Sequence, residues 1–204
     1  YLYSSPAIRI AGQRVLELTG LAPSEVDHVD IYSCFPVAVQ VGVREIGLDF
    51  NRPLTVTGGL TFNGGPLNNY VMHSIARMAE VLRSDTNSKG LITANGGMLT
   101  KHSFGVYSTT PPDKPFQHQD VQQEVDALPT RSVDPHFQGD VTIEGYNVMY
   151  GANGAEAAYV GGLNSEGMRT WSIVRDPDTL LAMTKEEFVG RKARRNTEHQ
   201  LEVL

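Results

Sequence analysis

Apolar residues recur at helical spacing in three stretches of the first half of the chain. Residues 6–20 place Ile, Ala, Val and Leu side chains on one helical face, and residues 35–46 carry a second apolar face. The most regular stripe lies within residues 67–82 and consists of Val71, Ile75, Met78 and Leu82. We therefore expect three amphipathic helices, of which the last has the clearest pattern.

Short runs rich in β-branched and aromatic residues separate and follow these helices. We expect strands at residues 28–32, 54–57, 90–94 and 105–109. Strands that alternate with helices indicate an α/β domain in which helices cover a sheet. Ligands in such domains bind at the carboxyl ends of strands, so the residues that follow the strands are candidates for a site. Three small or polar clusters take these positions: Tyr32-Ser33-Cys34, Gly58–Pro66 and Thr93–Gly97.

The composition of the chain changes after Thr109. Prolines mixed with Gln, Asp and Thr over residues 110–136 predict a linker or a wrapped arm. This divides the chain into an α/β domain at residues 1–109, the Pro-rich linker, and a β-rich domain at residues 137–204.

The β-rich domain shows strand patterns joined by turn residues. Alternation at residues 141–148, a glycine turn at 151–154, and further strand patterns at 155–163 and 169–174 predict a small antiparallel unit. Asp176-Pro177 is expected to open a short helix. Such a unit is typically barrel-like, as in the OB-fold.

Charge and cysteine usage exclude several classes of function. The 204 residues carry a formal net charge of −6, which argues against a nucleic-acid partner, and the one basic run, residues 191–195, is expected to be a solvated face. Cys34 is the only cysteine, which excludes a disulfide framework and fits a reducing, cytoplasmic location. No apolar run is long enough to span a membrane. The histidines show no metal-ligand spacing, so we expect no metal site.

The three small or polar clusters resemble, in order, three motifs of the thiolase family. Asp30-Ile31-Tyr32-Ser33-Cys34-Phe35 is similar to the Asn-Glu-Ala-Phe motif, and closer to the His-Asp-Cys-Phe version of sterol-carrier-type thiolases. Residues 58–66, Gly-Gly-Leu-Thr-Phe-Asn-Gly-Gly-Pro, match Gly-Gly-x-x-x-x-Gly-His-Pro without a gap. Thr93-Ala94-Asn95-Gly96-Gly97 takes the place of Cys-x-Gly-Gly-Gly. The resemblance implies the fold of a thiolase C-terminal half over residues 5–109, a mixed sheet with helices.

The tail extends the resemblance. Residues 136–192 resemble the additional C-terminal domain of acetyl-CoA acetyltransferase-like proteins, most clearly at 145–148, 167–171 and 176–177. The chain begins Tyr1-Leu2-Tyr3, without an initiator methionine. The resemblance implies that the N-terminal half of the same protein is a partner, and that the isolated chain exposes a large apolar face that this half covers.

The motif residues that move protons in thiolases are replaced here. On this alignment Gly65 occupies the position of the histidine that activates the nucleophile, and Thr93 occupies that of the cysteine that moves the alpha proton. Tyr32 stands where the first motif has Asn or His, and Ser33 replaces the acidic residue. The resemblance therefore implies an acyltransferase ancestry with degenerate catalytic positions. Candidate catalytic residues are Tyr32, Thr93 and His102.

The glycine loops and neighbouring polar residues are candidates for binding CoA or an acyl-CoA, as a ligand or substrate that is not covalently bound. Glycine permits close approach of the backbone to a flat ligand, although tight packing of two loops explains the same residues. The candidate binding residues are Gly58, Gly59, Asn63, Gly64, Gly65, Asn95, Gly96, Gly97 and Lys101.

Each candidate side chain also has a structural interpretation. Tyr32 is either an acid near the thioester oxygen or a strand-end residue, and Cys34 is expected to be a small buried residue. Lys101 and His102 either replace a missing acid or base, or form an exposed pair at a strand edge. His73 is expected to be a packing or interface residue.

Three hypotheses about function remain open. The chain is part of a degenerate thiolase-like protein of lipid metabolism that binds acyl-CoA, or of an enzyme with altered acid–base residues, such as an acyltransferase or retro-aldolase. Alternatively, its β-rich domain and Pro-rich arm form a protein-interaction module.

Overall fold

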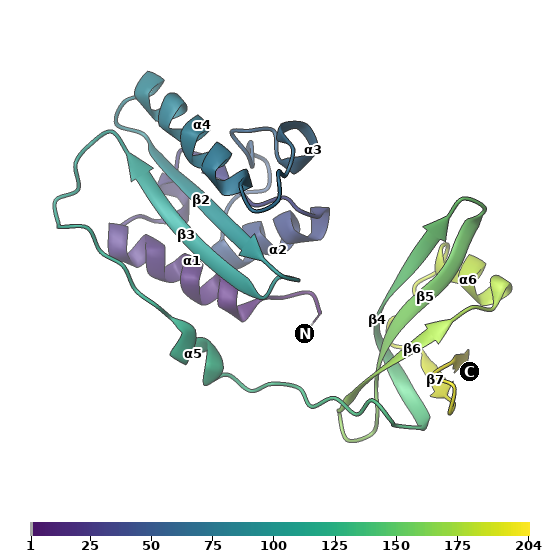
Figure 1. The fold of residues 1–204 in the computed structure, drawn as a ribbon. Coiled ribbons are helices and arrows are strands. Elements are labelled where there is room, and N and C mark those ends of the chain that lie inside the picture. Colours follow the sequence, from purple (N-terminus) through teal and green to yellow (C-terminus); the bar gives the residue numbers. More distant parts are fainter. Residues whose placement is uncertain (1) are drawn as a thin grey trace. The chain divides into compact units, whose positions relative to one another are not determined.

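The chain folds into two units, which are drawn together in Figure 1. The computed structural model describes residues 2–204. The first unit comprises residues 3–128, and the second comprises residues 129–204 together with Leu2. Each unit has its own hydrophobic core and is described by itself below.

Helix ends in the first unit follow capping signals in the sequence. Helix α1 (Pro6–Thr19) begins at Ser5, whose hydroxyl accepts from the Ile8 amide, and ends at Gly20 in the left-handed conformation. Helix α2 (Pro36–Ile46) ends at Gly47 in the same way. Helix α4 (Tyr70–Ser84) begins later than the expected residue 67, because Leu67 has φ of 51° and cannot belong to a helix. Shorter elements are η1 (Pro23–Glu25), α3 (Leu60–Asn63) and α5 (Gln122–Asp126).

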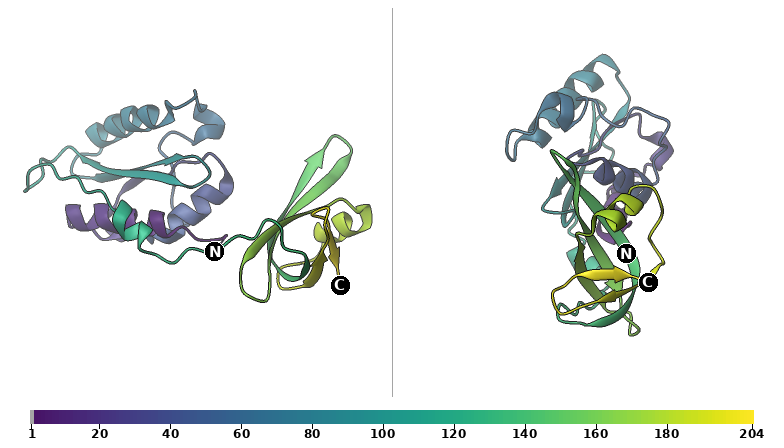
Figure 2. Two further views of the ribbon diagram at one scale, coloured as in Figure 1. Left: turned by 60° about the horizontal axis from the view of Figure 1, so that its bottom comes forward. Right: turned by 90° about the vertical axis from the view of Figure 1, so that its right-hand side faces the viewer.

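The helices of the first unit cover a three-stranded mixed sheet. The strands are β1 (His28–Asp30), β2 (Lys89–Gly96) and β3 (Lys101–Ser108), with β2 between a parallel β1 and an antiparallel β3. Helices α1 and α4 lie on opposite faces of the sheet (Figures 1 and 2). Successive side chains of β2 point to opposite faces of the sheet. Leu91 therefore packs in the hydrophobic cluster with α1 and α2, and Ile92 packs in the cluster with α4.

Residues 54–57, expected as a strand, do not form one. The Leu54 carbonyl accepts from the Ile31 amide at 2.9 Å, but the amides of Val56 and Thr57 donate to the carboxylate of Asp30 at 3.0 and 3.1 Å. Because a side chain takes these amides, they cannot join a β-ladder. Only the carbonyl of Leu54 bonds to the backbone at the end of β1.

The second unit is a curved antiparallel sheet with one covering helix. Its strands are β4 (Gly139–Gly151), β5 (Gly154–Leu163), β6 (Arg169–Val174), β7 (Lys192–Arg195) and β8 (Leu201–Val203), in the order β6-β5-β4-β7-β8. Helix α6 (Pro177–Met183) is capped by Asp176. A single bridge, between Ile173 and Gln200, joins the two edges. Within residues 2–204 no ladder closes the sheet, so the unit curls like a barrel without being one.

The basic run at residues 191–195 is only partly the solvated face that its composition predicts, because Lys192 and Arg194 are exposed whereas Arg195 is buried. It contains β7, in which Arg194 pairs with Asp140 at 2.7 Å. Arg195 is only 2 % exposed and donates to the backbone carbonyls of Trp171, Phe137 and Pro135. Burial lowers the pKa of the Arg195 guanidinium, and the charge of Asp134 only partly opposes this effect.

The Pro-rich segment is divided between the two units. Arg14 of α1 donates to Gln119 at 2.7 Å and pairs with Glu124 of α5 at 3.0 Å, so this part of the segment packs on the first unit. Residues from Pro129 onward belong to the second unit. None of the helices in residues 2–204 is long and apolar enough to cross a bilayer.

Candidate functional site

The three motif segments of the first unit meet at the carboxyl ends of β1 and β2. The Tyr32 amide donates to the hydroxyl of Thr93 at 2.9 Å, which joins the first motif to the third. The Leu60 amide donates to the hydroxyl of Ser33 at 3.0 Å, which joins the second motif to the first. The Asn95 amide group donates to the sulfur of Cys34 at 3.3 Å. Strand ends therefore bring the three segments together, as their order in the sequence leads one to expect.

The second motif is a loop whose shape depends on glycine at Gly59. Its φ is 77°, and a Cβ there would lie 2.7 Å from the Ser33 hydroxyl oxygen. Gly58 and Gly64 also have positive φ. Between these glycines the chain forms the single turn α3, which exposes Phe62.

Most amides of this loop are already occupied within the protein. The Gly59 amide donates to the Thr57 hydroxyl, and the Asn63 and Gly64 amides donate to the carbonyls of Gly59 and Leu60. Across residues 2–204, the amides of Gly58 and Gly65 have no acceptor. Only these two loop glycines are therefore free to donate to an oxygen of a ligand.

His73 lies beside the loop. Its sequence position, inside a predicted helix, did not indicate this contact. Its Nδ1 lies 2.9 Å from the side-chain nitrogen of Asn63, so that the Asn63 amide group can donate to this ring nitrogen. His73 is half-buried in the first turn of α4. The signal in the sequence is weak, because the two residues are ten positions apart and one of them lies in an irregular loop.

The third motif borders a small cavity of about 20 Å³, large enough for one water molecule. Tyr32, Thr93, Asn95 and His102 are among the residues that line it. The Asn95 side-chain oxygen is buried and has no hydrogen-bond partner among residues 2–204. The cavity therefore has a polar wall contributed by the first and third motifs.

His102 is not part of an exposed edge pair, whereas Lys101 is exposed. The His102 ring is half-buried, and its Nε2 lies 3.1 Å from the Leu99 carbonyl, to which it donates when protonated there. Burial lowers the pKa of His102, and the bond to Leu99 only partly opposes this effect. The hairpin between β2 and β3, with Gly97 and Leu99 at positive φ, folds the ring inward.

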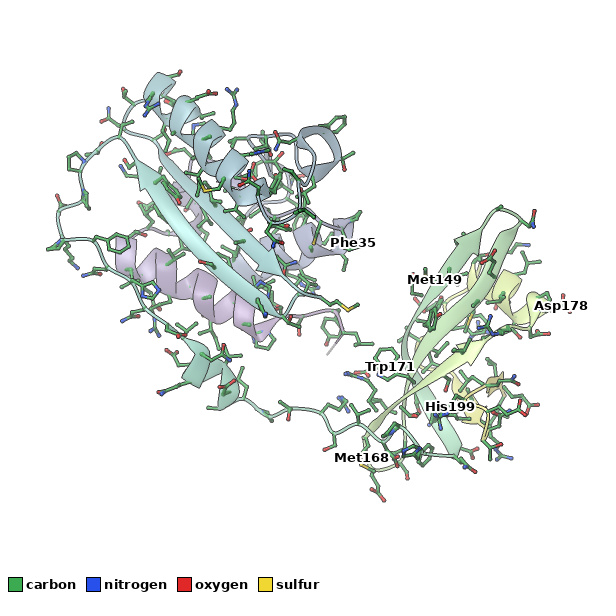
Figure 3. All side chains as sticks on the ribbon, in the orientation of Figure 1. Phe35, Met149, Met168, Trp171, Asp178 and His199 are labelled. Atoms are coloured by element: carbon green, nitrogen blue, oxygen red, sulfur yellow. The ribbon has the colours of Figure 1, made fainter. Side chains whose placement is uncertain are left out.

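Exposed apolar side chains belong to the same three motif segments. Phe35 is 69 % exposed at the start of α2 (Figure 3), Phe62 is 85 % exposed in α3, and Met98 is 92 % exposed after Gly97. Leu67, which follows the second motif, is 93 % exposed. The motif segments of the first unit thus carry exposed apolar side chains.

A concavity larger than the cavity at the third motif lies away from the motifs, between α1, the turn at residues 20–25 and the end of α2, and it is open to solvent. Among residues 2–204, no group of three or more His, Cys, Asp or Glu side chains is placed to hold a metal ion. The motif segments therefore remain the better candidate for a site.

Comparisons with known proteins agree with this architecture. Residues 120–199 match the family model of the thiolase-like protein type 1 additional C-terminal domain. The structure is similar to that of a monomeric SCP2-thiolase-like protein type 1 from Mycobacterium smegmatis, with a TM-score of 0.87 and 32 % sequence identity. The chain belongs to the thiolase-like superfamily. No match is found among curated proteins.

The match covers 98 % of this thiolase-like chain but only 46 % of the mycobacterial protein. The chain therefore spans less than half the length of that relative. A thiolase-like fold accounts for both units, the mixed α/β sheet and the additional C-terminal domain.

Proposed function

We propose that this thiolase-like chain contributes to binding of CoA or acyl-CoA thioesters in lipid metabolism, with little or no ordinary thiolase turnover. The observation that carries the proposal is the meeting of the three motif segments through the Tyr32–Thr93, Leu60–Ser33 and Asn95–Cys34 hydrogen bonds. We further propose a cytoplasmic location, which the single cysteine favours.

Binding is supported by backbone donors rather than by reactive side chains. The unengaged amides of Gly58 and Gly65 are donors of the kind that hold a thioester oxygen. Asn63 and Asn95 add polar groups that do not ionise. Lys101 is exposed next to the third motif, where an ammonium group favours a CoA phosphate.

Loss of ordinary turnover is supported by the chemistry at two positions. Gly65, at the histidine position, has no side chain, and within residues 2–204 no imidazole is hydrogen-bonded to Thr93, at the cysteine position. The Thr93 hydroxyl accepts from the Tyr32 amide, which holds it in a structural bond. A threonine hydroxyl without a neighbouring base is a poor proton acceptor.

A second candidate function, altered acid–base chemistry, rests on the small cavity. Tyr32 and His102 line it together, and burial favours the neutral form of His102, which can accept a proton. An acyltransferase or retro-aldolase that uses these groups fits the same site.

The exposed apolar residues of the motif segments support a partner. We propose that the N-terminal half of the same thiolase-like protein covers Phe35, Phe62, Leu67 and Met98. That half would also complete the ligand site.

Calorimetric titration of the longer thiolase-like protein with CoA and acetyl-CoA tests the proposal. We expect saturable binding that weakens about fivefold in Lys101→Gln, because one exposed charge contact contributes up to about 1 kcal/mol. The matched control is Lys114→Gln, an exposed lysine outside the motifs. Absence of saturable binding would contradict the proposal, and rapid cleavage of acetoacetyl-CoA that is lost in His102→Gln would favour the second candidate.

A further inference from the structure

We infer that Asp30 is a positioning residue that fixes both ends of the glycine loop at residues 58–66, and thereby sets the affinity of the loop for the thioester. The inference rests on the proposed function for its ligand. Its structural part, the control of loop geometry, stands on contacts within the first unit alone.

One oxygen of Asp30 holds the start of the loop. Oδ2 accepts from the amides of Val56 and Thr57 at 3.0 and 3.1 Å, and the Thr57 hydroxyl lies 2.9 Å from it. The Thr57 hydroxyl in turn accepts from the Gly59 amide at 3.1 Å. The conformation of Gly59, the residue that tolerates no Cβ, is therefore linked through Thr57 to Asp30.

The other oxygen of Asp30 holds the helix that follows the loop. Oδ1 lies 2.8 Å from the hydroxyls of Tyr70 and Ser74, on the first and second turns of α4. Asp30, Tyr70 and Ser74 are each 0 % exposed. The Tyr70 and Thr57 hydroxyl oxygens are also 2.7 Å apart, which connects the two ends of the loop directly.

The loop needs hydrogen bonds to a residue outside it in order to keep one conformation. Three of its glycines have positive φ, and glycine loses more conformational freedom on ordering than other residues. Hydrogen bonds to a carboxylate in a buried site are among the strongest in proteins. Burial, and then the neighbouring carboxylate, raise the pKa of Tyr70, which keeps its phenol protonated and able to donate.

The same contacts also suit a buried aspartate that only stabilises the fold. The two roles predict different effects when one hydrogen bond is removed: a local change at the loop, or a general loss of stability. Thr57→Val keeps the shape of the side chain but removes the hydroxyl between Asp30 and Gly59, and Thr57→Ser restores that hydroxyl. A positioning role predicts a local change at the loop that the serine variant reverses.

Hydrogen–deuterium exchange of the full chain measures this change without any ligand. We expect Thr57→Val to raise exchange about tenfold in peptides covering residues 57–63, with no rise in β2, and Thr57→Ser to resemble the wild type. Asp30→Asn should loosen the start of α4 as well, because the amide cannot accept from both sets of donors. Thr86→Val is the matched control, because this exposed threonine has no side-chain hydrogen bond to any of residues 2–204.

CoA binding to the longer thiolase-like protein provides the second readout. We expect CoA affinity to fall about tenfold in Thr57→Val and to recover in Thr57→Ser. If no variant or wild type binds CoA, the proposed function fails while the exchange result still decides the role of Asp30. Uniformly raised exchange throughout the first unit, or none at the loop, would overturn the inference. If Asp30→Asn does not fold, the two Thr57 variants decide alone.

Discussion

The two units of the chain differ in how exposed their most exposed apolar side chains are. Among the exposed large apolar side chains of the second unit, Tyr150 and Leu204 reach the highest exposure, 65 % and 66 %. In the first unit, Phe62, Leu67 and Met98 are each more than four-fifths exposed. All three lie in or beside the motif loops. The difference teaches that the motif end of the first unit is the better candidate for contact with a partner.

The largest effect expected from this difference appears when the units are produced separately. Residues 129–204 should unfold cooperatively in urea and remain monomeric, because they form a hydrophobic core of their own. Residues 3–128 should self-associate, since burial of one large apolar side chain contributes about 1.5–3 kcal/mol. Circular dichroism and light scattering measure both properties. A monomeric first unit with a sharp unfolding transition would contradict the expected difference between the two units.

Adding a single methyl group is expected to affect the glycine loop of the first unit more than a turn of the second unit. Gly59 and Gly154 both have positive φ, but a Cβ at Gly59 would meet the Ser33 hydroxyl at 2.7 Å, and at Gly154 it would meet nothing within 4 Å. Both alanine variants carry backbone strain, so we expect Gly59→Ala to cost about 1–3 kcal/mol more than Gly154→Ala. Urea unfolding of the full chain measures the difference.

The control for this steric effect is the neighbouring hydroxyl itself. Adding Ser33→Ala to Gly59→Ala removes the atom that the new methyl group meets, and part of the lost stability should return. Equal losses in Gly59→Ala and Gly154→Ala would show that Ser33 does not restrict the loop.

The sequence was a good guide where one local pattern determines the structure. The helical stripe that includes Met78 and Leu82 predicts α4, and Asp176-Pro177 predicts the start of α6. Residues 54–57 were mispredicted because their amides bond to Asp30, more than twenty positions away. The burial of Arg195 was missed for the same reason, since its carbonyl partners in β6 and near Pro135 are 24 and 60 positions away.

The candidate site, too, could be predicted only in part from the sequence. The meeting of the motif segments follows from strand order, so that the contact of Tyr32 with Thr93 could be anticipated. The positions of His73 and His102 could not be, because each depends on how an irregular loop or a tight hairpin turns. The role of Asp30 was hidden by its place inside a strand, where an aspartate gives no sign of its partners.

The smallest expected effect is a pH dependence confined to the first unit. The pKa of His102 is lowered from its ordinary value of 6.5 by burial, so the folded state favours the neutral ring. Its contribution to stability is therefore complete above pH 6.5 and decreases as the pH falls from 6.5 toward the folded-state pKa. Urea unfolding at pH 7.5 and 5.5 should show a loss in the wild type that is smaller in His102→Gln, whose side-chain amide can still donate to Leu99. His136→Gln, at an exposed histidine of the second unit, should keep the loss of the wild type. If instead His136→Gln reduces the loss and His102→Gln does not, the pH sensitivity belongs to the second unit, and burial of His102 does not control it.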